Sequence, residues 1–207
     1  MPAHPPVRAL RQRGSVIIEL ALALSVAVPL LLGVGAIGIR LGRTLQATQL
    51  TRDVAHMYAL GADFSLAGTQ AIASTLSRNY NLTSAGQAVL LFSSVRKVQQ
   101  IDCTAAGLHT CPNLNLTVFT QRIAIGNTAL RTSAFGTPPA TYIGSGGNIL
   151  AADYCQQTSL IATGFDSVLM LAAGQTSTLV EGYFNMPDIN FLSFPSSGGG
   201  YYVRFLF

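Results

Sequence analysis

The longest hydrophobic stretch of the chain lies close to its start. Arg8, Arg11 and Arg13 precede Gly14, and the next residues read SVIIELALALSVAVPLLLGVGAIGI. A helix of about 24 residues is about 36 Å long, which is enough to cross the hydrocarbon core of a bilayer. The pattern therefore predicts a membrane-spanning helix over residues 15–40. It would contain Pro29, which membrane helices tolerate, often with a kink.

Beyond this run the apolar positions narrow to a single stripe. Leu50, Val54, Met57, Tyr58 and Gly61 recur at helical spacing among polar residues. We therefore expect one long helix that continues past the membrane as an amphipathic stem over residues 41–62. Its apolar stripe would dock on the rest of the chain, and Gly61 would cap its end.

The remaining residues, 63–207, carry shorter patterns that predict a head of mixed structure. Strand-like segments are rich in β-branched and aromatic residues. The predicted elements are a helix over 66–80, an antiparallel strand pair over 88–98 and 115–126, a hairpin over 167–172 and 178–185, and a terminal strand over 201–207. The segment 127–166 has little periodicity, which indicates a long surface excursion. The sequence thus predicts an α+β protein whose long N-terminal helix packs on an antiparallel β-sheet head.

Three processing routes fit a basic and then apolar N-terminus. A secretory signal would be cut after the apolar core, where residues 34–36 (VGA) offer a weak site. A plain signal anchor would not be cut. A prepilin leader, residues 1–14, would be removed by cleavage between Gly14 and Ser15. We favour the third route because it accounts for the glycine at the charge boundary, the absent spacer and the position of Glu19, the fifth residue of the mature chain.

Glu19 is the ionisable residue of the apolar run. A carboxylate within a membrane is costly, and such residues mark functional sites. We therefore expect Glu19 to set the register of assembly with other subunits. The basic leader favours a cytoplasmic N-terminus and an exported head.

The net charge offers no sign of a nucleic-acid partner. The formal charge of the whole chain is +4, but three of the twelve basic residues lie in the predicted leader. Nine basic residues against eight acidic ones leave the mature chain at +1. A basic surface for nucleic acid is therefore not expected.

No residue constellation in the sequence indicates catalysis, so we expect neither an enzyme nor a cofactor. Cys103, His109 and Cys111 lie close together, but they lack the paired spacing and the fourth ligand of a metal site. A disulfide between Cys103 and Cys111 is the favoured interpretation, because the two cysteines enclose a short polar loop. Cys155 would then be free, although it could also capture either partner after folding.

The segment GSVIIEL resembles the signature of type IV pilins and pseudopilins, a glycine followed by four residues and a glutamate. The run ALALSVAVPLLL with Pro29 and the pair Gly42-Arg43 extend the likeness. So do residues 120–138 (TQRIAIGNTALRTSAFGTP) and 174–185 (GQTSTLVEGYFN). Together these segments resemble the TadE-like minor pseudopilins of the tight-adherence (Flp, type IVb-like) pilus system.

The resemblance implies a pilin-like α+β fold and a structural subunit that is processed by a prepilin peptidase and takes part in pilus assembly. Its implied partners are other pilin or pseudopilin subunits, the inner-membrane assembly platform and membrane lipid. Its implied location is the bacterial inner membrane, in a single pass with a periplasmic head, with incorporation into a surface pilus as a further stage. Two alternatives stay open: a type II secretion pseudopilin, and an uncleaved membrane-anchored binding or sensor domain that recognises its ligand through residues 127–166.

Overall fold

The protein is described by a computed structural model that covers residues 13–77, 80–185 and 199–207. Its first element, helix α1 (Arg13–Ala59), is 47 residues long. This agrees with the expected long N-terminal helix. The chain divides into two compact units between Arg43 and Thr44. The second unit is called the head below, and its described residues are 44–185 and 199–207.

Helix α1 ends in a left-handed turn at Gly61. This glycine has a φ of 92°, a conformation that costs a residue with a side chain free energy. Its N–H group donates to the carbonyl of Tyr58, and the N–H group of Ala62 donates to the carbonyl of Met57, both at 3.0 Å. These two bonds satisfy carbonyl groups in the last turn of the helix in the pattern of a Schellman motif. The expected cap is therefore present.

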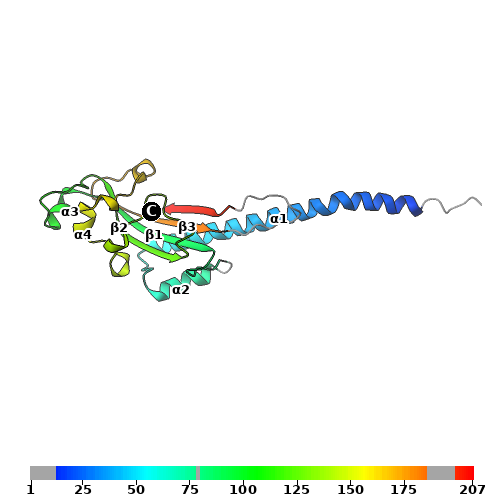
Figure 1. Cartoon of the computed structure of the whole chain (residues 1–207), viewed down its shortest axis with the longest axis horizontal. Helices are drawn as coiled ribbons and strands as arrows, with labels where there is room; N and C mark the ends of the chain where they lie inside the picture. Colours follow the sequence, from blue (N-terminus) through cyan, green and yellow to red (C-terminus); the bar gives the residue numbers. More distant parts are fainter. Residues whose placement is uncertain (1–12, 78–79, 186–198) are drawn as a thin grey trace, which may run out of the picture. The chain divides into compact units, whose positions relative to one another are not determined.

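A four-stranded antiparallel sheet forms the centre of the head (Figure 1). Its order is β2-β1-β3-β4, and every neighbouring pair is antiparallel. The strands are β1 (Ala88–Lys97), β2 (Thr117–Gly126), β3 (Thr176–Phe184) and β4 (Tyr201–Leu206). The predicted pairing of the first two strands and the predicted terminal strand are both confirmed, so the protein belongs to the α+β class.

The predicted hairpin over 167–172 and 178–185 is wrong. The second of its segments forms β3, but the first begins in a 3-10 turn, η4 (Phe165–Ser167), and contains no strand. The N–H groups of Val168 and Leu169 donate to the carbonyl of Phe165, which continues the tight turn instead of an extended chain. A short apolar run has no period that separates these two conformations. Strand β3 pairs instead with β1 and β4.

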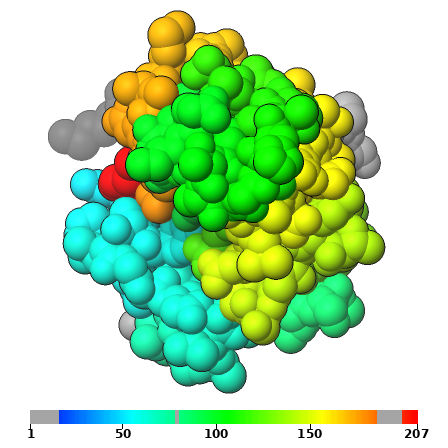
Figure 2. Space-filling view, turned by 90° about the vertical axis from the view of Figure 1, so that its left-hand side faces the viewer, coloured from blue at the N-terminus to red at the C-terminus, as the bar shows by residue number. Residues whose placement is uncertain are grey.

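Short helices complete the head. They are α2 (Ala67–Leu76), α3 (Gln100–Ala105), α4 (Ala151–Gln156) and the 3-10 turns η1 (Ala140–Tyr142), η2 (Ser145–Gly147) and η3 (Thr158–Leu160). Helix α2 is shorter than the predicted 66–80. Helices α3 and α4 lie together at one end of the head in Figure 1. Figure 2 shows the same end, with the green segment around residue 100 beside the yellow segment around residue 150.

One face of the sheet packs on the head portion of α1. Successive strand residues point to opposite faces, and the side chains on this face share one apolar cluster with α1 and the turn after it. The ring of Phe64 stacks on that of Phe92 with centroids 4.2 Å apart. The cluster includes Leu50, Val54, Tyr58, Phe64, Leu90, Phe92, Ile123, Val180 and Phe184. The predicted stripe on α1 is therefore largely buried, apart from Gly61 at its exposed end.

The opposite face of the sheet is covered by the segment 127–166. Its apolar side chains join those of the strands in a second cluster: Val95, Phe119, Phe135, Ile149, Leu160, Ala162, Phe165, Leu171 and Leu179. The expectation of a long surface excursion therefore holds only in part, because many residues of this segment are exposed while several of its apolar side chains lie in the core. Its buried residues are spaced irregularly because turns, rather than a helix or a strand, bring them to the sheet. These buried apolar residues are part of the core.

Candidate membrane-anchoring and assembly site

The first part of α1 is apolar on every side and is left uncovered. Apart from Leu32, which is partly exposed, its large hydrophobic side chains are between 46% and 69% exposed: Val16, Ile17, Ile18, Leu20, Leu22, Leu24, Val26, Val28, Leu30, Leu31, Val34, Ile37, Ile39 and Leu41. Within the described residues, α1 is the helix that is long and apolar enough to span a membrane. Pro29 lies inside it, and the helix continues on both sides. A helix with apolar residues all round needs an apolar surrounding, which is consistent with a single-pass anchor.

Glu19 lies in this uncovered part of α1. Its side chain is exposed, and its helical neighbours Val16 and Leu22 are apolar. Among the described residues Glu19 forms no ion pair. Gly14 and Ser15 also belong to α1, whereas residues 1–12 of the predicted leader lie outside the described part of the chain. Ser15 and Glu19 are four residues apart, so they lie on the same face of the helix.

The second part of α1 is fixed to the head by a close contact with β3. Thr51 is fully buried, and it lies over Gly182, where an added Cβ atom would come within 2.5 Å of the Thr51 Oγ1 atom. A glycine is therefore what allows the helix this close to the strand. The Tyr58 hydroxyl adds polar contacts 2.9 Å from Ser94 Oγ and 2.7 Å from Gln121 Oε1.

Glu181 is a buried polar site that the sequence analysis missed. Its carboxylate lies on the face of the sheet that segment 127–166 covers, and its side chain is 1% exposed. It accepts hydrogen bonds from the hydroxyl of Ser133, from the backbone N–H of Ala134 at 2.9 Å and from the hydroxyl of Tyr202 at 2.6 Å. Arg122 lies 3.9 Å away. These contacts tie β3 to β4, to β2 and to the covering segment.

This network explains how a charge is accommodated in the core. A buried carboxylate is tolerated only when it is paired and hydrogen-bonded. Burial raises the pKa of Tyr202, and its bond to Glu181 raises it further because the phenol donates to a negative group. Burial lowers the pKa of Arg122, while the Glu181 carboxylate opposes that shift. Each of these groups already has a partner within the head, so we assign the network to the packing of the sheet.

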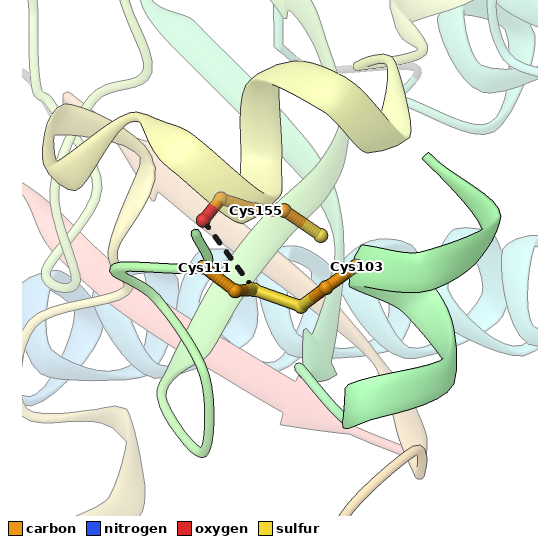
Figure 3. A group of neighbouring side chains, drawn as sticks. All are labelled: Cys103, Cys111 and Cys155. Carbon is orange, nitrogen blue, oxygen red and sulfur yellow. Dashed lines mark hydrogen bonds between the residues drawn. A yellow bond between two sulfur atoms is a disulfide. The ribbon is translucent and has the colours of Figure 1, made fainter. Parts of the chain in front are cut away.

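The three cysteines come together at the end of the head where α3 and α4 lie (Figure 3). Cys103 on α3 and Cys111 form a disulfide with their Cα atoms 5.9 Å apart, and Cys155 on α4 is a buried free thiol. Their sulfur atoms all lie within 4.8 Å of one another. Soft metal ions are held by thiolates, but the disulfide occupies two of the three sulfurs. His109 is not a member of this group.

No family model matches the chain, and neither the curated proteins nor the solved structures include a match.

Proposed function

We propose that this protein is a structural subunit of a pilus-like assembly, a TadE-like minor pseudopilin that is anchored in the bacterial inner membrane by α1. The observation that carries the proposal is the position of Glu19. It lies in the uncovered apolar part of α1, five residues beyond Gly14, and it has no cationic partner among the described residues. A carboxylate in that position is costly in a bilayer unless assembly supplies a partner.

Cleavage by a prepilin peptidase would supply that partner. Hydrolysis of the bond between Gly14 and Ser15 leaves a free α-amino group on Ser15, which is positively charged near neutral pH. Within one subunit this amine lies a single helical turn from Glu19. Between subunits, Glu19 of an incoming chain can pair instead with the amine of a chain already in place.

The pairing between subunits would set the axial register. Two charges that are paired in an apolar surrounding tolerate burial, whereas either charge alone is strongly penalised. The apolar sides of neighbouring α1 helices could slide past one another with little change in free energy, since lipid and leucine side chains are equally apolar. The charge pair would favour one register over the others. The head would meanwhile make contacts outside the membrane.

The resemblance to TadE-like pseudopilins implies the partners of this function. They are the prepilin peptidase, other pilin or pseudopilin subunits, the inner-membrane assembly platform and membrane lipid. The apolar part of α1 meets lipid before assembly and meets other α1 helices afterwards. Apolar side chains of segment 127–166 pack against the sheet, so these side chains do not serve the ligand recognition that a sensor domain would require.

Two substitutions of Glu19 test the proposal. Glu19→Gln and Glu19→Leu should both leave cleavage and membrane insertion intact, and the leucine variant should insert slightly better because no charge is buried. Both should reduce assembled pili, or copurification with partner subunits, by about 100-fold or more, since an uncompensated buried charge costs several kcal/mol. The measurement is the amount of assembled subunit recovered from cells, normalised to the membrane-inserted amount.

Asp53→Asn is the matched control. Asp53 is an exposed carboxylate on the same helix but within the head, so its loss removes an equal charge without touching the membrane part. This variant should assemble at the wild-type level. Wild-type assembly of both Glu19 variants would show that Glu19 does not set the register and would overturn the proposed mechanism.

A further inference from the structure

The disulfide and the free thiol at the α3–α4 end of the head lie close enough to react with one another. The sulfurs of Cys103, Cys111 and Cys155 are mutually within 4.8 Å. In Figure 3 the Cys155 side chain extends from α4 toward the disulfide. A thiolate beside a disulfide can attack one of its sulfur atoms and displace the other.

Local structure holds the three cysteines in place. Helix α3 starts with a capping box in which Asp102 accepts the backbone N–H of Gln99 at 3.1 Å, and Cys103 follows directly. On the other side, Asn113 donates its backbone N–H to the carbonyl of Cys155 at 3.2 Å, and its side-chain amide donates to the carbonyl of Tyr154 at 2.9 Å. These bonds fix α4 against the loop that carries Cys111.

The three sulfurs differ in their access to water. Cys103 and Cys155 are 0% exposed, whereas Cys111 is partly exposed. A thiolate that water can reach is more stable than a buried one, so Cys111 is the better leaving group of the disulfide. Attack on the Cys111 sulfur would instead release Cys103 as a buried thiolate, which is costly. The difference in burial therefore selects attack on Cys103.

We propose that Cys103, Cys111 and Cys155 form a thiol–disulfide exchange site that presents Cys111 to external disulfides of low molecular weight. In the first step the Cys155 thiolate attacks the Cys103 sulfur. The Cys155–Cys103 bond forms, the Cys103–Cys111 bond breaks, and Cys111 leaves with the electron pair as a thiolate. In the second step that thiolate attacks an external disulfide, forms a mixed disulfide and releases one external thiolate. The two steps conserve the number of disulfide bonds and need no other oxidant.

The charges around Cys155 determine how the exchange depends on pH. Burial raises the pKa of the Cys155 thiol, and the Asp102 carboxylate on α3 raises it further, while Arg96 on β1 opposes this shift. Tyr154, beside Cys155 on α4, has a pKa that burial raises, so it is neutral at ordinary pH. The thiolate of Cys155 is therefore scarce at neutral pH, and exchange should be slow there and become faster as the pH rises.

The test treats the folded, full-length protein with oxidised glutathione in the absence of reductant. Intact mass and peptide mapping without reduction should show one glutathione per chain, attached to Cys111, with Cys103 and Cys155 linked. The rate of attachment should increase with pH. Glutathione on Cys155 with the Cys103–Cys111 bond intact would overturn the proposal, and so would an unmodified chain throughout the pH range.

Two variants separate exchange from direct modification. Cys155→Ser removes the attacking thiol, so it should keep the Cys103–Cys111 disulfide and take up no glutathione. Modification of this variant at the wild-type rate would contradict the proposal. Cys111→Ser leaves the two buried cysteines, which one molecule of oxidised glutathione should convert to the Cys103–Cys155 disulfide with release of two glutathione thiols, so that no free thiol remains on the protein in denaturant. Two free thiols in a folded Cys111→Ser variant, with a native near-ultraviolet circular dichroism spectrum, would also contradict it. None of these results depends on the pilus assignment.

Discussion

The two parts of helix α1 bear similar hydrophobic residues in different arrangements. From Val16 to Leu41 the large apolar side chains point to all sides and, except for the partly exposed Leu32, are at least 46% exposed. Within the head, Leu50, Val54 and Tyr58 form a stripe, and none of the three is more than 6% exposed. A stripe fits one protein surface, whereas an all-round apolar helix fits an apolar solvent. The arrangement of the apolar residues, rather than their number, therefore indicates what covers each part.

The same contrast extends to the glycines. An added Cβ atom at Gly38, in the first part of α1, would meet nothing within 4 Å. At Gly182, on the strand beneath the second part, it would lie 2.5 Å from Thr51 Oγ1 and 2.8 Å from Phe184 Cε2. In a membrane-spanning helix, a small residue at such a position leaves room for another helix. In the head, the space beside Gly182 is already occupied by side chains of the same chain.

The largest difference in stability between variants of the two parts of α1 should come from replacing one leucine with alanine in each part. Leu50→Ala removes a side chain that is 4% exposed and leaves a cavity in the core, so the head should lose about 2–5 kcal/mol of unfolding free energy. Leu22→Ala removes a side chain that is 65% exposed and should change the stability of the head by less than about 0.5 kcal/mol. Denaturant titration in detergent, followed by near-ultraviolet circular dichroism, measures both.

Equal losses for the two leucine variants would contradict the division of α1 into a buried and an uncovered part. A loss of stability for Leu22→Ala alone would mean that the stability of the head depends on the uncovered part of α1. The far-ultraviolet spectrum of each variant provides the control for helix content.

A smaller effect should follow from adding one methyl group in each part. Gly182→Ala forces the close contact between β3 and α1 apart, and overpacking of this kind should cost the head about 1–3 kcal/mol. Gly38→Ala adds a methyl group in open space and should leave the stability of the head within about 0.5 kcal/mol of the wild type. The same denaturant titration applies. A neutral Gly182→Ala variant would show that the strand and the helix can separate at little cost.

The face of the sheet that packs on α1 could be predicted from the sequence, because the patterns that identify its elements are local. Helical spacing identifies the stripe of Leu50, Val54 and Tyr58, and Gly61 marks the end of the helix. Short runs of β-branched and aromatic residues predict strands β1, β2 and β4. The recurrence of apolar residues about every three or four positions in a helix stripe, and about every second position in a strand, depends only on neighbouring residues.

The other face could not be predicted, because its contacts join distant parts of the chain. Phe135 and Phe165 reach the sheet from a segment of turns. Gly164, with a φ of 75°, adopts the left-handed conformation directly before the turn that begins at Phe165. Glu181 has the pattern of an exposed strand residue, yet Ser133 and Tyr202 bury it. The contact between Cys155 and the Cys103–Cys111 disulfide likewise depends on α4 reaching α3. No local period encodes such contacts.

The central claim is that the uncovered part of α1 is the mature N-terminus of an assembly subunit. Intact mass and N-terminal sequencing of the membrane protein, isolated from cells with an active prepilin peptidase, test it most directly. The account predicts cleavage between Gly14 and Ser15, and a mature chain that begins SVIIEL. A chain that keeps residues 1–14 in those cells, or one that begins at Ile37 as after an ordinary secretory cleavage, would contradict it.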